Sequence, residues 1–207
     1  DLLREYARKI DKSASATPPI DRLKGGDTVY LSACDSSGVM VSFIQSNYFG
    51  FGSGIVVPGT GIALQNRGWG FTLERGHPNE VGPAKKPFHT IIPGFLTKGS
   101  RPFGSFGVMG GPMQAQGHLQ MTNRIVNYHQ NPQAASDAPR WQILSDFSVA
   151  VEPGFPSSIA EGLAERGHKV KYMTSYHSFG GAQIILSNDN GYVAGSDHRK
   201  EGAAVGF

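Results

Sequence analysis

The sequence predicts an α+β fold in which layers of β-sheet and α-helix pack on one another. Glycine supplies 28 of the 207 residues, about twice the usual share of ~7%, and this favours short strands and tight turns over long helices. Segments with alternating apolar residues open and close the main part of the chain, and helical patterns lie between them. This order of strands, then helices, then strands indicates packed layers of sheet and helix rather than βαβ winding.

The first elements differ sharply on the two sides of Thr28. Residues 1–11 have apolar residues at helical spacing and predict a short amphipathic helix. Residues 12–26 are rich in Ser, Ala, Pro and Gly, a composition typical of an exposed, pliant connector. From Thr28 onward apolar and polar residues alternate around a turn at 35–38, so residues 28–46 predict a β-hairpin whose first strand opens with Thr28.

The rest of the chain predicts further strands and two helices. The strands are expected near 55–57, 61–65, 88–96, 103–109, 182–187 and 191–195. One helix is expected over 113–130, just after Pro112, which suits the first turn of a helix. The second is expected near 158–166, because Gly167 lies where that helical pattern should end.

The composition argues against several classes of function. The net charge of +3 comes from 19 basic and 16 acidic residues that are scattered along the chain, which does not favour nucleic-acid binding. The seven histidines are dispersed without paired ligand spacing, so we expect no metal site. The glycines of 50–54 lead into an extended run and fit no dinucleotide or phosphate loop, so we expect no cofactor. No apolar stretch approaches the ~18 residues of a membrane span.

Several separate blocks of sequence resemble one enzyme family. Residues 52–66 read GSGIVVPGTGIALQN, and further blocks follow at 82–87, 107–111, 138–140 and 195–199. In order and spacing, these blocks resemble the small-subunit portion of the γ-glutamyltransferases (γ-glutamyltranspeptidases), which are N-terminal-nucleophile hydrolases. The resemblance covers essentially all of residues 28–207.

This resemblance implies a fold, a processing event and a partner. The fold would be a four-layer αββα sandwich, completed by a large subunit that is missing from this chain. The precursor would cleave its own bond between Asp27 and Thr28. Residues 1–27 would then be the tail of the large subunit with the processing linker, and residues 28–207 the small-subunit catalytic domain. The two subunits would form a heterodimer, either alone or as a dimer of heterodimers.

Thr28 is the nucleophile that the resemblance implies. A threonine hydroxyl is a weak nucleophile and needs a base within hydrogen-bond reach. An N-terminal threonine supplies this base itself, because its free α-amine titrates near ~7.7–8. Before cleavage the same nitrogen belongs to an amide and has no basicity. The freed Thr28 would attack a small-molecule amide, form an acyl-enzyme and transfer the acyl group to water or to an amine.

Other site residues follow from matching positions. Ser46 corresponds to a second hydroxyl residue, usually threonine, that supports the nucleophile by hydrogen bonding. Gly110 and Gly111 correspond to the oxyanion-hole glycines, and their N–H groups stand just ahead of a predicted helix, where negative charge is favoured. Asn66 matches an asparagine with a structural or pocket role. A polar strand end for Ser46 and a plain Gly-Gly turn remain structural alternatives.

The substrate-recognition positions depart from the family pattern. Gly70 stands where γ-glutamyl-specific members have an acidic residue for the substrate α-ammonium. Tyr48 replaces an asparagine, Arg67 a glutamine, and His89-Thr90 a Ser-Ser pair. Arg67 and His89 would favour an acidic or neutral acyl group, such as glutaryl.

Three functions therefore remain open. The leading hypothesis is cleavage of γ-glutamyl amides, that is, glutathione-type compounds. The first alternative is a glutaryl-type amidohydrolase, similar to cephalosporin acylases, without γ-glutamyl specificity. The second, from another class, is an inactive structural homologue.

Overall fold

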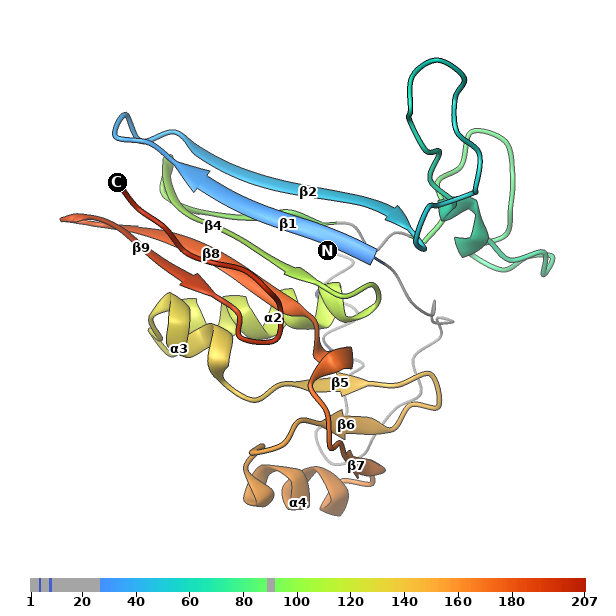
Figure 1. The fold of residues 1–207 in the computed structure, drawn as a ribbon. Coiled ribbons are helices and arrows are strands. Elements are labelled where there is room, and N and C mark those ends of the chain that lie inside the picture. Colours follow the sequence, from blue (N-terminus) through green and yellow to red (C-terminus); the bar gives the residue numbers. More distant parts are fainter. Residues whose placement is uncertain (1–3, 5–7, 9–26, 89–91) are drawn as a thin grey trace. The chain divides into compact units, whose positions relative to one another are not determined.

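The computed structural model describes residues 4, 8, 27–88 and 92–207 (Figure 1). The described residues form two compact units, one that contains residues 139–179 and the other residues 27–88, 92–138 and 180–207. Arg4 and Arg8 are helical, while the rest of the helix predicted over 1–11 and the connector over 12–26 lie outside the described residues. Within the described ranges, no helix is both long and apolar enough to cross a membrane.

The larger unit is built from a hairpin, a four-stranded sheet and a pair of helices (Figure 1). The hairpin consists of β1 (Asp27–Cys34) and β2 (Met40–Tyr48). The antiparallel sheet has the order β3 (Gly94–Lys98), β4 (Arg101–Met109), β8 (Gly181–Asn188), β9 (Gly191–Ser196). The helices α2 (Met113–Val126) and α3 (Pro132–Asp137) lie on the face of this sheet away from the hairpin. The layers therefore run helix, sheet, sheet.

The hydrophobic core of this unit lies between the four-stranded sheet and the helices. Its buried members are Phe106, Val108, Met121, Ile125, Ala135, Ala182 and Ile184. This packing holds α2 against β4, and only three residues separate the end of β4 from the start of α2. The turn between β4 and α2 is consequently fixed at the end of the sheet.

The interface between the hairpin and the sheet contains hydroxyl groups. The Tyr30 hydroxyl lies 2.8 Å from Ser32 Oγ and 2.6 Å from Ser42 Oγ. The Ser42 hydroxyl donates to the carbonyl of Gly94 at 2.7 Å. A Cβ on Gly107 would lie 2.4 Å from the Tyr30 ring, so glycine is needed for this close approach. The even-numbered residues of β1 thus face the sheet.

The opposite face of the hairpin is apolar and exposed in the part of the chain that the structure describes. Val29, Leu31, Val41 and Phe43 are between 44% and 66% exposed. The predicted alternation is present, but the apolar residues point away from the sheet of the same unit. Exposed apolar patches of this kind often mark interaction surfaces.

The long connection from β2 to β3 contains less strand than expected. The segments predicted at 55–57 and 61–65 form only an isolated bridge between Val56 and Ala63. Their backbone bonds, including Val57 N–H to Ile62 O at 2.9 Å, stay within this loop, since the other partners are Ser53 and Thr60. The strand predicted over 88–96 begins at Gly94, and residues 89–91 lie outside the described part. The short 3-10 helix η1 (Arg67–Gly70) lies in the same connection.

The smaller unit corrects the expectation that βαβ winding is absent. Its sheet has the order β5 (Trp141–Ile143), β6 (Val149–Val151), β7 (Val170–Tyr172). The strands β6 and β7 are parallel, and α4 (Ser157–Glu165) connects them. Three-residue strands are too short to show an alternating pattern, which is why the sequence did not predict them. The helix predicted near 158–166 is confirmed, and the one predicted over 113–130 ends earlier, at Val126.

Candidate active site

Thr28 stands at an irregularity in the hairpin. Asp27 pairs with Tyr48, whereas Val29 pairs with Gln45. Two residues of β2, Ser46 and Asn47, therefore lie opposite the single residue Thr28. A bulge of this kind turns side chains out of the regular register, and it is common next to active sites. The predicted pair of hydroxyl residues is thus brought to the same place in the hairpin.

Gly110 and Gly111 form the turn between β4 and α2. Their carbonyl groups accept the N–H groups of Met113 at 3.1 Å and of Gln114 at 3.0 Å. Their own N–H groups have no hydrogen-bond acceptor in the part of the chain that the structure describes. Gly110 has φ +124° and Gly111 φ +57°, conformations that favour glycine. Unpaired N–H groups at the start of a helix are suited to hold an oxyanion.

Gln114 links this turn to Thr28. Its side-chain nitrogen donates to Thr28 Oγ1 at 3.2 Å, across 86 positions of sequence. The side chain is 1% exposed, and its backbone N–H is tied to Gly111 as described above. Sequence reasoning missed this residue. The available signal was its place in the first turn of the helix that follows the two glycines.

The end of β2 forms a second group of candidate residues. The Ser46 hydroxyl accepts the backbone N–H of Tyr48 at 2.9 Å. Asn66 Oδ1 accepts the N–H of Phe49 at 3.1 Å, which fastens the following loop to the strand end. The Arg67 guanidinium donates to the carbonyl of Ser46 at 3.2 Å and lies 5.5 Å from the centre of the Tyr48 ring. Ser46, Tyr48, Asn66 and Arg67 therefore lie together.

Tyr48 is unusual in this group. Its φ is +80°, and it is 3% exposed. Burial raises the pKa of its phenol, and the phenol oxygen has no hydrogen-bond partner among the described residues. Burial also lowers the pKa of Arg67, although a guanidinium remains charged at neutral pH. The site thus holds a partly desolvated cation next to a buried phenol.

The other predicted recognition positions are Gly70, His89 and Thr90, and the structure describes no charged side chain at any of them. Gly70 is buried at the end of η1, and its carbonyl accepts the side-chain amide of Asn79. His89 and Thr90 lie outside the described residues.

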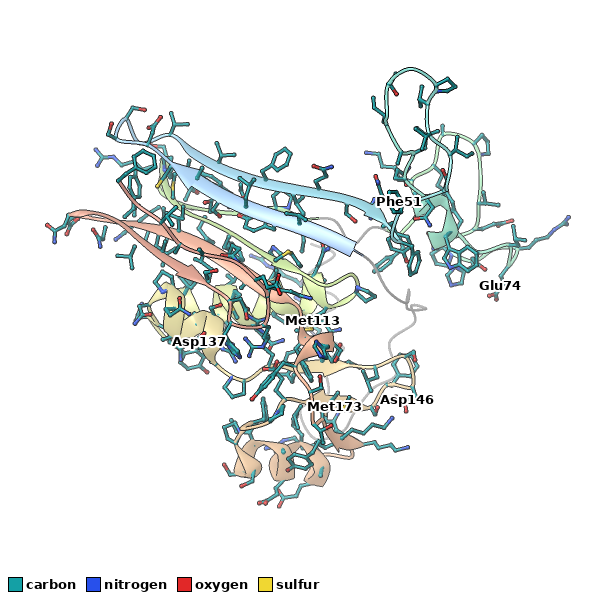
Figure 2. All side chains as sticks on the ribbon, in the orientation of Figure 1. Phe51, Glu74, Met113, Asp137, Asp146 and Met173 are labelled. Atoms are coloured by element: carbon teal, nitrogen blue, oxygen red, sulfur yellow. The ribbon has the colours of Figure 1, made fainter. Side chains whose placement is uncertain are left out.

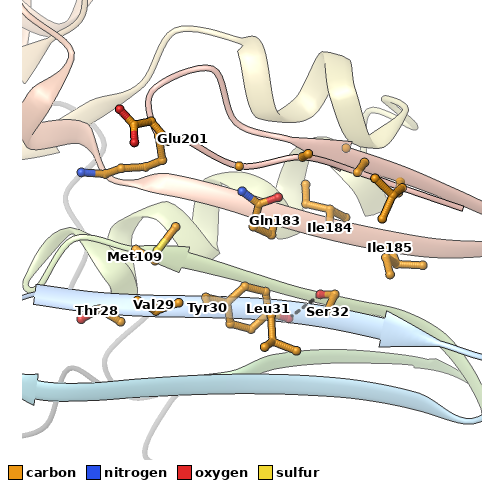
Figure 3. A pocket seen from close by; sticks show the side chains of 17 residues that line it. Thr28, Val29, Tyr30, Leu31, Ser32, Met109, Gln183, Ile184, Ile185 and Glu201 are labelled. Atoms are coloured by element: carbon orange, nitrogen blue, oxygen red, sulfur yellow. Dashed lines mark hydrogen bonds between the residues drawn. The ribbon is translucent and has the colours of Figure 1, made fainter.

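A cavity of about 430 Å³ opens beside Thr28. Its walls come from residues 28–32 of β1, residues 183–185 of β8, Met109 and the C-terminal segment 200–205. Figure 3 shows Thr28 at one end of this row, with Met109 and Glu201 toward the same end. The candidate nucleophile therefore borders an open space.

All 207 residues match the family model described as gamma-glutamyltranspeptidase. The chain belongs to this family. It is 36% identical to the glutathione hydrolase-like YwrD proenzyme of Bacillus subtilis, and also 36% identical to the oxamate amidohydrolase proenzyme of Klebsiella pneumoniae. The whole chain is covered in both comparisons, but only 41% and 40% of these relatives. The chain thus spans about two fifths of the length of the relatives that it matches.

A solved structure of similar fold agrees with this family assignment. The crystal structure of cephalosporin acylase from Bacillus halodurans aligns with a TM-score of 0.82 and 49% identity, over 98% of this chain and 37% of the acylase chain. The predicted fold class, the αββα sandwich of N-terminal-nucleophile hydrolases, is thereby confirmed. The described residues of the larger unit supply the helix, sheet, sheet part of it. The names of these relatives mention three different compounds, namely glutathione, oxamate and cephalosporin.

Two other charged residues of the family blocks have structural partners. Arg140 is fully buried, and its guanidinium donates to the carbonyl of Phe179 at 2.9 Å within the smaller unit. Asp197, in the larger unit, accepts the N–H of Ala182 at 2.7 Å and pairs with Arg199 at 3.1 Å. Buried charged side chains that are hydrogen-bonded in this way hold their segments in place. Their partners account for both residues without a catalytic role.

Proposed function

We propose that the full-length protein is a precursor that cleaves its own Asp27–Thr28 bond and then hydrolyses amides with Thr28 as the nucleophile. The observation that carries this proposal is the bond from Gln114 to Thr28 Oγ1. It ties the hydroxyl to the helix that begins directly after Gly110 and Gly111. A nucleophile and a set of oxyanion donors are thus attached to one rigid element.

The chemistry of both reactions uses the same atoms. In the precursor, Thr28 Oγ1 adds to the carbonyl carbon of Asp27, and its proton passes to the Thr28 nitrogen as the C–N bond breaks. Water then hydrolyses the resulting ester, which releases the Asp27 carboxylate and leaves Thr28 with a free amine and a free hydroxyl. In the mature enzyme this amine takes the Oγ1 proton during attack on the substrate and returns it to the leaving amine.

Sequencing of the mature protein tests this proposal directly. We expect two chains, one of which begins Thr-Val-Tyr-Leu-Ser, as residues 28–32 read. A mature protein in a single piece, or a new N-terminus at another position, would contradict the proposal.

For the acyl group, we propose γ-glutamyl amides first, in line with the glutathione hydrolase-like relative. A specific observation favours glutaryl amides as the second candidate. Gly70 offers no carboxylate for a substrate α-ammonium, while Arg67 places a cation beside Ser46. The similarity to a cephalosporin acylase points the same way. The ratio of γ-glutamyl to glutaryl anilide turnover separates the two, and equal or better γ-glutamyl turnover would remove the argument from Gly70.

An Arg67→Met variant should lose activity on acidic acyl groups. A carboxylate left without its cationic partner in a partly desolvated site costs about 2 kcal/mol, so kcat/KM for glutaryl anilide should fall roughly 30-fold. Arg75→Met, which changes an exposed arginine of the same connection, should leave it unchanged. Steady-state kinetics on both variants checks this, and an equal loss in the two would exclude a specific role for Arg67.

We further propose that the rest of the precursor covers the apolar face of the hairpin and forms a heterodimer with residues 28–207. The exposed side chains of Val29, Leu31, Val41 and Phe43 support this, because an isolated apolar sheet face is a poor surface in water. The relatives are proenzymes more than twice as long as this chain, so they contain residues enough for such a layer.

Phe43→Asp should therefore weaken the association of the two mature chains. Placing a carboxylate in a buried apolar contact removes the gain from burying the ring, about 1.5–3 kcal/mol, and adds a desolvated charge. We expect less of the small chain to copurify with a tagged large chain. Phe51→Asp changes a phenylalanine that is 84% exposed in the connection between β2 and β3 (Figure 2), and it serves as the matched control. Equal recovery with both variants would show that the hairpin face is not the contact.

A further inference from the structure

In the side-chain amide of Gln114, the nitrogen has a hydrogen-bond partner and the oxygen has none among the described residues. Its nitrogen donates to Thr28 Oγ1 at 3.2 Å. Its oxygen Oε1 is buried and has no hydrogen-bond partner among the described residues. A buried amide oxygen without a partner is unfavourable, so such an atom calls for an explanation.

The backbone leaves this side chain little freedom. Gln114 is in the first turn of α2, its N–H is bonded to Gly111, and its carbonyl lies 2.7 Å from Nδ1 of His118. The side chain is 1% exposed, so no water-filled space surrounds it. The amide is therefore held at the nucleophile in a fixed position.

We propose that Gln114 is a positioning residue that binds both functional atoms of Thr28, Oγ1 through Nε2 and the α-amine through Oε1. This inference rests on the proposed function, because the amine exists only after cleavage. In the precursor the Thr28 nitrogen is part of a peptide bond. Once the peptide bond is broken, the Thr28 nitrogen carries additional N–H groups. The unpaired Oε1 of Gln114 then gains a donor on the same residue, Thr28, whose hydroxyl Nε2 already contacts.

The two bonds have distinct effects on the reaction. The Nε2–H group stabilises the negative charge that grows on Oγ1 as its proton leaves, both in self-cleavage and in attack on a substrate. The Oε1 atom accepts from the ammonium that forms when the amine takes this proton, and so it stabilises the charged form. No atom of Gln114 is transferred in either step.

The elements around Thr28 carry other titratable groups that set the background for its amine. They are Asp27 next to it, Tyr48 at the end of β2, Arg67 in the following loop, His118 on α2, and Lys200 and Glu201 on the wall of the cavity. Because these groups are the same in every variant of Gln114, differences between variants report the amide alone.

The test uses Gln114→Met and Gln114→Glu in the full-length precursor. Methionine keeps the length of the side chain but neither donates nor accepts as an amide does. We expect slower self-cleavage and a fall in kcat on the order of 10- to 100-fold, with little change in KM, as for loss of a hydrogen bond to a charged group. Precursor half-life on denaturing gels and steady-state kinetics with γ-glutamyl and glutaryl anilides give these values.

The pH profile separates positioning from a merely structural role. Activity should rise with pH as the amine loses its proton, and any group that stabilises the ammonium raises that pKa. Gln114→Met removes the acceptor, so the acid limb should move to lower pH by about one unit. Gln114→Glu places a carboxylate there, so the limb should move to higher pH. Shifts of opposite sign are not expected from a packing defect.

Gln120→Met is the matched control. Gln120 is a buried glutamine of the same helix, 6% exposed, whose side-chain amide donates to the carbonyl of Gln116 at 3.1 Å. The Gln120→Met precursor should cleave itself and hydrolyse the anilides at the same rates as the unchanged protein. Thermal unfolding identifies any variant that fails to fold, and Gln114→Glu, with almost the same shape, then carries the test.

The outcomes keep this inference apart from the proposed function. If Thr28→Ala still cleaves, the nucleophile itself is wrong. If Thr28→Ala blocks cleavage while folded Gln114→Met cleaves and turns over normally, only the role of Gln114 is overturned. If cleavage slows but the acid limb does not move in either variant, the bond from Oε1 to the amine is refuted.

Discussion

A full-length precursor with Thr28→Ala is expected to remain a single chain and to lose amide hydrolysis by about 10⁶-fold, as after removal of other hydroxyl nucleophiles. The methyl group of alanine offers no oxygen to attack Asp27 or a substrate. Without cleavage, the nitrogen of residue 28 also stays in a peptide bond and cannot act as a base. One substitution thus removes both the nucleophile and the step that creates its base.

Denaturing gels over time and anilide hydrolysis measure the two losses. Thr28→Ser keeps the hydroxyl and should cleave and turn over, although more slowly. Thr60→Ala changes a loop threonine whose hydroxyl donates to the carbonyl of Val57, and it should behave as the unchanged protein. If the unchanged precursor neither cleaves nor hydrolyses any amide, the protein is the inactive homologue that the sequence left open.

The hairpin shows what the sequence could and could not predict. The alternation over 28–46 correctly predicted both strands and the turn between them. It could not tell which face of the hairpin would be covered by the sheet of the same unit. The usual assumption, apolar face inward, is wrong here because the Ser32 and Ser42 hydroxyls donate to carbonyls of the sheet, between which the Tyr30 ring packs on Gly107. Periodicity records that a face is buried, but not which part of a protein buries it.

The site shows the same limit at the level of single residues. The family blocks pointed to the turn of Gly110 and Gly111, because glycines in a fixed pattern leave a visible signature. Gln114 leaves only a weak signal, its place in the first turn after the two glycines, since glutamine is common in helices and its partner Thr28 lies 86 positions away in the sequence. The bulge that sets Ser46 opposite Thr28 depends on the register of two strands, which alternation does not specify.

Gly110→Ala should have the second largest effect, because two demands meet at this position. A Cβ there would lie 2.9 Å from the Cα of Gly180, a backbone atom that cannot rotate away. The φ of +124° adds backbone strain of about 1–3 kcal/mol for any other residue. The turn must move to accommodate alanine, and its N–H groups move with it. A displaced oxyanion donor lowers kcat by about 10²–10³-fold, which anilide kinetics on cleaved protein would show.

A comparison of three glycine variants separates strain from catalysis. Gly54→Ala places alanine at φ +76° with no atom within 4 Å of its Cβ, so it should lower stability by about 1–2 kcal/mol and leave kcat unchanged. Gly180→Ala brings a Cβ to 2.2 Å from the carbonyl oxygen of Met109 and presses on the same turn from the opposite side. It should therefore lower kcat as Gly110→Ala does, although residue 180 carries no proposed catalytic group. A normal kcat in folded Gly110→Ala would show that this turn does not hold the oxyanion. If instead Gly110→Ala and Gly180→Ala both lower kcat while Gly54→Ala does not, the contact between the two glycines is what holds the N–H groups in place.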